Sequence, residues 1–227
     1  MCNDVAHQHA DEKTADLHRA QYEYLVPIVK AFSTENSVEV ASLGMQVHGG
    51  MGYIEETGAP QYYRDARILP IYEGTTAIQA NDFIGRKILR DGGAVSRGFI
   101  AAMCDTVNAL NQHQDDPALA FIGTQLEVAV QAYQNALVAT LEFAARGQMR
   151  SAFAGSVPLL MLAGYVHAGW HLANAALKSR ERQSDIHRQK QATAVFYAAH
   201  LLPRALSLSS AVKAGDNVQE AFSAVFS

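Results

Sequence analysis

The chain has 227 residues, 49% of them hydrophobic, so it can bury a sizeable core and is not a disordered tail. Its 18 basic and 22 acidic residues give a formal net charge of -4 and form no basic stripe, which argues against a nucleic-acid partner. The two cysteines, Cys2 and Cys104, lie far apart and in no metal-ligand spacing, so neither a disulfide framework nor a cysteine metal site is predicted.

The N-terminal sequence, MCNDVAHQHADEKTADLH, resembles neither a secretory signal nor an import sequence. It has no apolar core, and it is not Arg-rich and acid-poor. We therefore expect a cytoplasmic protein. His7, His9 and His18 fall in this stretch, but His7 and His18 are eleven residues apart and too distant to share an ion. We expect solvated histidines here and no metal site.

Apolar residues at intervals of three and four predict an amphipathic helix from about Ala15 to Phe32. Pro27 interrupts its hydrogen-bond ladder and is expected to kink it. The next residues offer caps for a second helix, which is predicted to run to about Val47: Ser33, Thr34 and Asn36. The glycine-rich run at 49–52 then predicts a tight turn at the C-terminus of that helix.

A short helix is expected near 59–66, and Pro70 separates it from a long helix predicted at about Gly74–Arg90. The sequence Asp91-Gly92-Gly93 ends that helix and forms the best internal boundary of the chain. We therefore expect two domains, residues 1–93 and 94–227.

Further helical patterns lie at about 94–112, 117–146, 156–180, 186–212 and 218–226. Pro117 after Asp115 and Asp116 suits the first turn of a helix with an acidic cap. Alternating β-branched runs between hairpin turns do not occur. The sequence therefore predicts an all-α fold, built as an antiparallel helical bundle.

The uncharged segment Val157–Leu177 allows two interpretations. It is long enough to cross a bilayer. It also contains His167, His171 and Asn174, and its alanines and glycines suit close helix contact in a protein core. We favour a central bundle helix. The two histidines lack a surrounding His-Glu-x-x-His pattern, so we expect core or interface histidines and not metal ligands.

Three motifs lie in the first half of the chain: QVHGG at 46–50, YRDAR at 63–67 and IYEGT at 71–75. In this order and spacing they resemble the C-terminal domain of the acyl-CoA dehydrogenases. The resemblance is greatest to longer members with an additional C-terminal helical segment. It implies that residues 1–93 are a partial C-terminal-like domain of that family and that residues 94–227 are the helical extension.

The resemblance also implies domains that this sequence lacks. Members of the family have an N-terminal helical domain and a middle β-domain ahead of this region, and neither precedes it in the 227 residues. The family's flavin ring lies between the β-domain and the C-terminal helices. We therefore expect this chain to be the C-terminal portion of such an enzyme and to be inactive alone. We expect its partners to be further copies of itself or a complementary N-terminal chain.

Glu73 of the IYEGT motif is the candidate general base. Removing a proton from the α-carbon of a thioester while a hydride leaves the β-carbon requires a carboxylate on one face and an oxidised flavin on the other. The resemblance implies this role for Glu73, with FAD as hydride acceptor, an acyl-CoA as substrate and an electron-transfer acceptor as a partner. Gly74 removes bulk beside the base, so that substrate can approach it. We expect an apolar acyl pocket to desolvate Glu73.

Four further residues are candidate cofactor-binding groups. Thr75 is expected to cap the following helix, and the resemblance implies that it touches the flavin nucleotide. The resemblance also implies that Gln46, Gly49 and Gly50 meet the nucleotide of a flavin held by a neighbouring subunit. Glycine amides at such a turn are able to approach phosphate oxygens closely.

A function from a different class also fits the sequence. The apolar helices of the C-terminal segment favour a non-catalytic helical module for oligomerisation or protein interaction, because such faces seek a partner when left uncovered. In a sedimentation measurement, a stable monomer that binds no flavin would argue against both this module and the enzyme.

Overall fold

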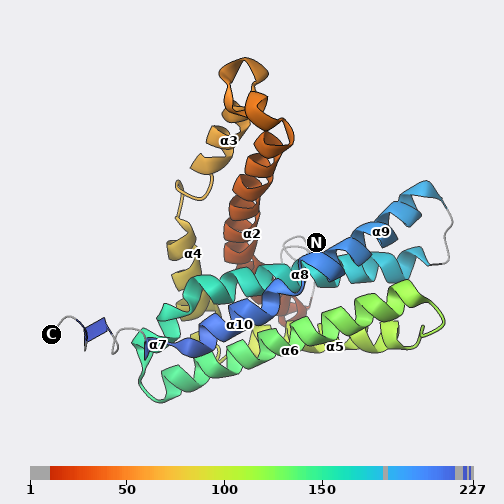
Figure 1. Ribbon diagram of the computed structural model, residues 1–227. Helices are drawn as coiled ribbons and strands as arrows, with labels where there is room; N and C mark the ends of the chain where they lie inside the picture. Colours follow the sequence, from red (N-terminus) through yellow and green to blue (C-terminus); the bar gives the residue numbers. More distant parts are fainter. Residues whose placement is uncertain (1–10, 181–183, 218–221, 224, 226–227) are drawn as a thin grey trace. The chain divides into compact units, whose positions relative to one another are not determined.

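The computed structural model describes residues 11–180, 184–217, 222–223 and 225 (Figure 1). All regular structure in this part of the chain is helical, so the predicted all-α class is confirmed. The chain divides into two compact units, Met1–Phe83 and Ile84–Ser227. The domain boundary expected at Asp91–Gly93 lies a few residues further on and stays a prediction.

The first unit is built on one long helix, α2 (Glu12–Val47), of 36 residues. Asp11 caps it, because its carboxylate accepts a hydrogen bond from the Thr14 N–H at 3.1 Å. The sequence-based prediction of two helices with a break at Ser33–Asn36 is therefore wrong. Pro27 lies inside the helix and is buried, and the helix continues through it.

The residues expected to start a new helix instead bond to the preceding turn of α2. The Thr34 hydroxyl donates to the Lys30 carbonyl at 2.8 Å, and the Asn36 side-chain amide donates to the Phe32 carbonyl at 2.6 Å. Small polar side chains offer the backbone either a cap or such a back-bond, and only the surroundings decide which forms. Here α3 and α4 pack along α2 and favour the continuous helix.

The remaining elements of the first unit pack against α2. They are the 3₁₀ turns η1 (Gly49–Tyr53) and η2 (Glu55–Thr57) and the helices α3 (Ala59–Ile68) and α4 (Thr76–Asp82). Figure 1 shows α3 alongside the later part of α2, with α4 following it. The helix predicted at Gly74–Arg90 begins at Thr76 and becomes a π-helix at Phe83–Leu89. Tyr24 and Phe83 are fully buried, with ring centroids 5.0 Å apart.

The glycine-rich run does follow the end of a helix, as predicted. α2 ends at Val47, and Gly49 has φ 61. Gly52 has a further requirement, because a Cβ at this position would lie 2.1 Å from the Met45 carbonyl oxygen. Only glycine allows η1 to fold back so closely on the last turn of α2.

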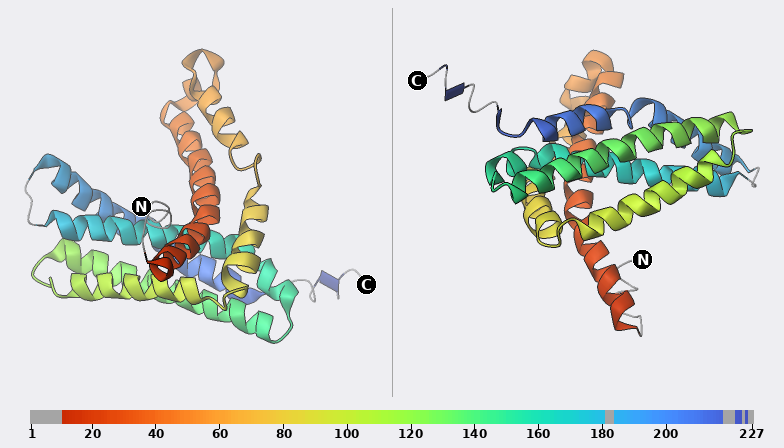
Figure 2. Two further views of the ribbon diagram at one scale, coloured as in Figure 1. Left: turned by 180° about the vertical axis from the view of Figure 1, so that it is seen from behind. Right: turned by 90° about the horizontal axis from the view of Figure 1, so that it is seen from below.

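The second unit is a bundle of helices: α5 (Ala94–Asn111), α6 (Pro117–Ala145), α7 (Met149–Ala154), α8 (Ser156–Ser179), α9 (Asp185–His200) and α10 (Arg204–Ala214). Figure 2 shows α5, α6, α8 and α10 running side by side, in agreement with their contacts. Asp116 caps α6, accepting from the Ala118 and Leu119 N–H groups at 3.0 and 3.2 Å. This confirms the acidic cap predicted before Pro117.

α8 is the central helix of this bundle. It contacts α5, α6, α7, α9 and α10, and most of its residues are buried. The interpretation of Val157–Leu177 as a central bundle helix is therefore confirmed. In the described part of the chain, no helix is both long and apolar enough to span a membrane.

The single helix predicted at 186–212 is wrong, because the chain breaks between α9 and α10 at Leu201–Pro203. Proline has no N–H and disfavours helical backbone in the residue before it. The break also allows Leu202 to pack against α8 at Gly169, where an added Cβ would lie 2.6 Å from the Leu202 side chain. The helix predicted at 218–226 lies largely outside the described residues.

Candidate active site

Glu73 lies in the loop between α3 and α4. Its φ is 53, and it is the non-glycine residue with a positive φ in the described part of the chain. Gly74 follows with φ 95. Among the described residues, neither the N–H nor the carboxylate of Glu73 has a hydrogen-bond partner, and the side chain is exposed. The carboxylate is therefore held at an unusual backbone position and remains available to a ligand.

Thr75 ends this loop as the N-cap of α4, as the sequence predicted. Its hydroxyl accepts a bond from the Ile78 N–H at 3.4 Å, and its carbonyl accepts from the Gln79 N–H at 2.9 Å. A hydroxyl that accepts in this way keeps its own proton for donation to a ligand. Gly74 is covered by Gln79, whose Nε2 lies 2.6 Å from the position that a Cβ would take.

Two residues of α2 that sequence reasoning missed hold the ends of the loop. Lys30 Nζ donates to the Leu69 carbonyl at 2.5 Å and to the Tyr72 carbonyl at 3.0 Å. Glu35 accepts a short hydrogen bond from the Thr76 hydroxyl. The sequence offered little indication of this role, because lysine and glutamate on an amphipathic helix are usually expected to face solvent. In the structure both residues are half-buried.

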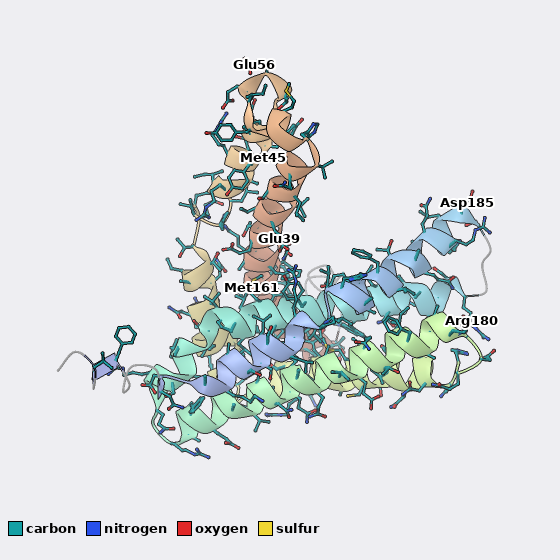
Figure 3. All side chains as sticks on the ribbon, in the orientation of Figure 1. Glu39, Met45, Glu56, Met161, Arg180 and Asp185 are labelled. Carbon is teal, nitrogen blue, oxygen red and sulfur yellow. The ribbon has the colours of Figure 1, made fainter. Side chains whose placement is uncertain are left out.

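Gln46, Gly49 and Gly50 lie at the C-terminal end of α2 and are exposed. Figure 3 shows this end of the unit, with Met45 near the end of α2 and Glu56 at the turn beyond it. Thr75 and Glu73 lie at the other end of α3, so the structure does not bring the two groups of candidate residues together within this chain (Figure 1). The expectation that the glycine turn meets a ligand of a neighbouring subunit stays a prediction.

The candidate cofactor groups fit a nucleotide by their chemistry. A Cβ at Gly49 or Gly50 would meet no atom within 4 Å, so their backbone is open to approach. Gln46 offers an exposed amide, and Thr75 offers a hydroxyl donor at the start of a helix. Backbone amides, an amide side chain and a helix start are groups that bind phosphate and base edges.

The YRDAR motif contributes a surface ion pair near the glycine turn. Arg64 Nη1 and Nη2 donate to the two carboxylate oxygens of Glu55 at 2.8 and 2.9 Å. The hydrogen bond from Arg64 lowers the pKa of Glu55, and the same bond raises the pKa of Arg64. Both side chains are exposed, so this pair ties α3 to η2 and contributes little to stability.

The histidines singled out from the sequence form no metal centre in the described part of the chain. There, no three His, Cys, Asp or Glu residues are grouped in a way that would hold an ion. His167 is buried in the bundle, as expected for a core histidine, with its ring 4.9 Å from that of Phe99. His7 and His9 lie outside the described residues.

Two family models match the chain. The model for the C-terminal domain of acyl-CoA dehydrogenases covers residues 1–89, and the model described as acetyl-CoA dehydrogenase C-terminal like covers residues 99–222, more than half of the chain. The chain belongs to the acyl-CoA dehydrogenase family. The resemblance drawn from the three motifs is thereby confirmed.

Several acyl-CoA dehydrogenases are similar to the chain in sequence. It is 46% identical over 200 residues to 3-methylmercaptopropionyl-CoA dehydrogenase of Ruegeria pomeroyi, a match that covers 86% of this chain and 34% of that protein. It is 33% identical over 207 residues to the broad-specificity linear acyl-CoA dehydrogenase FadE5 of Mycobacterium tuberculosis, and this match covers 85% of this chain and 33% of FadE5. A butyryl-CoA dehydrogenase of Syntrophomonas wolfei is 26% identical over 224 residues, and this match covers 94% of this chain and 36% of that protein. The chain thus spans about a third of the length of these relatives.

Proposed function

We propose that the chain is the C-terminal helical part of a flavin-dependent acyl-CoA dehydrogenase, with Glu73 as its general base. The observation that carries this proposal is the IYEGT loop, in which an available carboxylate sits in a left-handed backbone conformation at the start of α4. A non-glycine residue keeps such a conformation only where its surroundings favour it, and such positions cluster at functional sites.

The proposed reaction is the α,β-dehydrogenation of an acyl-CoA thioester. The Glu73 carboxylate accepts a proton from the α-carbon, and the thioester oxygen gains negative charge as that proton leaves. The Glu73 N–H, which has no partner among the described residues, stabilises that charge by hydrogen bonding. FAD, when bound, supplies the acceptor for the hydride of the β-carbon. We assign its nucleotide to Thr75 of one subunit and to Gln46, Gly49 and Gly50 of another.

The lone chain is proposed to be inactive. Glu73 is exposed here, whereas a base next to an acyl chain works best in an apolar pocket that excludes water. In the proposal, the substrate and the two thirds of the enzyme that this chain does not span provide that pocket. Its partners are therefore a complementary flavin-binding chain, further copies of itself and an electron-transfer acceptor.

The test joins this chain to the part of the Ruegeria pomeroyi relative that it does not cover. Oxidation of acyl-CoA is measured with FAD and an artificial electron acceptor. We expect activity in the hybrid and no activity in the lone chain. Glu73→Gln should lower kcat roughly a hundred- to ten-thousandfold, because a general base contributes about 10² to 10⁴. Glu56 is an exposed glutamate at η2, and Glu56→Gln, the matched control, should leave kcat unchanged. Full activity in Glu73→Gln would remove Glu73 from the mechanism.

A non-catalytic oligomerisation module is the second candidate, and one surface favours it. α2 exposes a series of large apolar side chains: Leu17, Val26, Val29, Val40, Leu43 and Val47. A monomer rarely leaves so many such residues uncovered along one helix. Sedimentation of the chain with and without FAD separates the candidates: an oligomer indifferent to flavin supports the module, and flavin-dependent assembly supports the enzyme.

A further inference from the structure

Lys30 and Glu35 of α2 contact both ends of the Glu73 loop. We propose that they are positioning residues, which set the direction of the base without touching substrate. This inference rests on the proposed function, since it concerns how Glu73 is aimed. Neither residue belongs to any of the three sequence motifs.

The loop needs support from outside itself. Glu73 has φ 53, a backbone conformation that is unfavourable for a residue with a Cβ. Among the described residues, no backbone hydrogen bond is made by Glu73 or Gly74. The conformation therefore depends on how the residues on either side are held.

Lys30 fixes the side of the loop that precedes the base. Its ammonium bonds the Tyr72 carbonyl at 3.0 Å, which belongs to the same peptide group as the Glu73 N–H. Because a peptide group is planar, fixing this oxygen fixes the orientation of the Glu73 nitrogen. The ammonium also bonds the Leu69 carbonyl at 2.5 Å and lies 5.3 Å from the centre of the Tyr72 ring. One cation thus holds Tyr72 through both its backbone and its side chain.

Glu35 fixes the side that follows the base. It accepts the hydrogen bond of the Thr76 hydroxyl, and Thr76 is the first residue of α4. The start of α4 is thereby tied to the same helix that holds Tyr72. A charged acceptor makes this bond stronger than a neutral one would. Three residues, Glu73, Gly74 and Thr75, connect the two residues held by α2.

A displaced base affects turnover more than binding. Placing a catalytic group about 1 Å from its productive position can cost roughly a hundredfold in rate. A loss confined to the transition state lowers kcat and leaves KM nearly unchanged. The roles of Lys30 and Glu35 therefore predict a kinetic signature different from that of a residue that only stabilises the fold.

The first test measures the backbone of Glu73 in the lone chain by NMR. Lys30→Met keeps the apolar stem and removes the three donors, and Lys13→Met removes an exposed lysine of the same helix. We expect the order parameter of the Glu73 and Gly74 amides to fall from about 0.85, typical of rigid backbone, to below about 0.6 in Lys30→Met. Lys13→Met should leave it unchanged.

The second test measures kcat, KM and the isotope effect of α-deuterated acyl-CoA in the hybrid enzyme. We expect Lys30→Met and Glu35→Leu to lower kcat roughly ten- to a hundredfold with little change in KM, and to raise the isotope effect as proton transfer becomes slower. Lys30→Arg keeps the cation and Glu35→Gln keeps an acceptor for Thr76, so both should recover much of the rate.

The outcomes separate this inference from the proposed function. If Glu73→Gln abolishes turnover while Lys30→Met and Glu35→Leu keep the wild-type kcat, the assignment of Glu73 as base is supported and the positioning role is wrong. If the two variants lower kcat only in proportion to the folded fraction, with an unchanged isotope effect and an unchanged Glu73 order parameter, the residues are structural and the inference also fails. If Glu73→Gln remains active, the proposed function itself fails.

Discussion

The buried histidine of α8 predicts that the second unit loses stability on mild acidification. His167 is 4% exposed and lies between aromatic side chains, with its ring centroid 4.9 Å from that of Phe99 and 6.1 Å from that of Trp170. Burial lowers its pKa from 6.5 to about 3, and the charge of His171 adds to the effect. The folded bundle therefore keeps this imidazole neutral at a pH where the unfolded chain protonates it.

The direction and size of the effect follow from proton linkage. The pKa of His167 is lowered by folding, so its contribution to stability is complete above pH 6.5 and is lost as the pH falls towards 3. Between those values the free energy of unfolding decreases by about 1.4 kcal/mol per pH unit. From pH 7 to pH 5 the loss is about 2 kcal/mol, before most carboxylates titrate.

The assay is urea unfolding followed by the fluorescence of Trp170, the single tryptophan of the chain and a neighbour of His167. His167→Phe keeps an aromatic ring and removes the titrating group, so its stability should change about 2 kcal/mol less between pH 7 and pH 5 than that of the wild type. His113→Gln, which replaces a histidine of the α5–α6 connection, should keep the wild-type slope. Equal slopes for wild type and His167→Phe would refute the reasoning.

Two pairs of substitutions, each a test variant and its control, probe the local geometry of the two units by chemical denaturation. Gly52→Ala should destabilise the first unit by about 1 to 3 kcal/mol, because the added Cβ would collide with the backbone of α2. In the control Gly44→Ala the added Cβ meets no atom within 4 Å, so this change should stabilise the unit by up to about 1 kcal/mol. Similar changes in stability for the two variants would contradict this account of the glycine turn. Asp116→Ala should cost about 1 kcal/mol through loss of the α6 cap. Asp115→Ala, whose exposed carboxylate pairs with Arg180, should change stability by less than about 0.5 kcal/mol. An equal loss in both variants would exclude the cap as the cause.

The elements that the sequence predicted well are those with strong local signals. The span of α6 followed from Asp116, Pro117 and nearly thirty residues of apolar periodicity, and it ends within a residue of the expected position. α8 was recognisable because a helix that is apolar on all sides needs a covered environment. Both cases depend on local propensity and tertiary packing favouring the same structure.

The two wrong helix predictions have separate physical origins. Thr34 and Asn36 have the same side-chain chemistry whether they cap a new helix or bond back to the preceding turn, and the packing of α3 and α4 on α2 decides between the two. The sequence does contain Pro203 at the break, but the apolar periodicity on both sides of it led to the prediction of a single helix. The continuity of α2 depends on contacts distant in sequence, which no local pattern encodes, whereas the break after α9 has a local cause in the proline.

The site shows the same division between local and distant information. A motif identified Glu73, Gly74 and Thr75, and the capping role of Thr75 followed from its chemistry. Lys30 and Glu35 were not identifiable, because their partners lie 39 to 42 residues further along the chain. A lysine on a half-buried helix face has many possible acceptors, and only the fold shows that it bonds the peptide group of the candidate base.

In the proposed mechanism, the direction of the Glu73 carboxylate and its desolvation come from different parts of the enzyme. The contacts that hold its loop all arise within the first unit, from α2, α3 and α4, so the left-handed conformation is expected in the lone chain. The described residues leave the Glu73 side chain exposed, so in the proposed mechanism its desolvation comes from bound substrate and the rest of the enzyme. The backbone coupling constants of Glu73 in the lone chain measure φ directly. A positive φ supports a loop preset by α2, whereas a negative φ would mean that α2 does not hold it and that binding must organise the base.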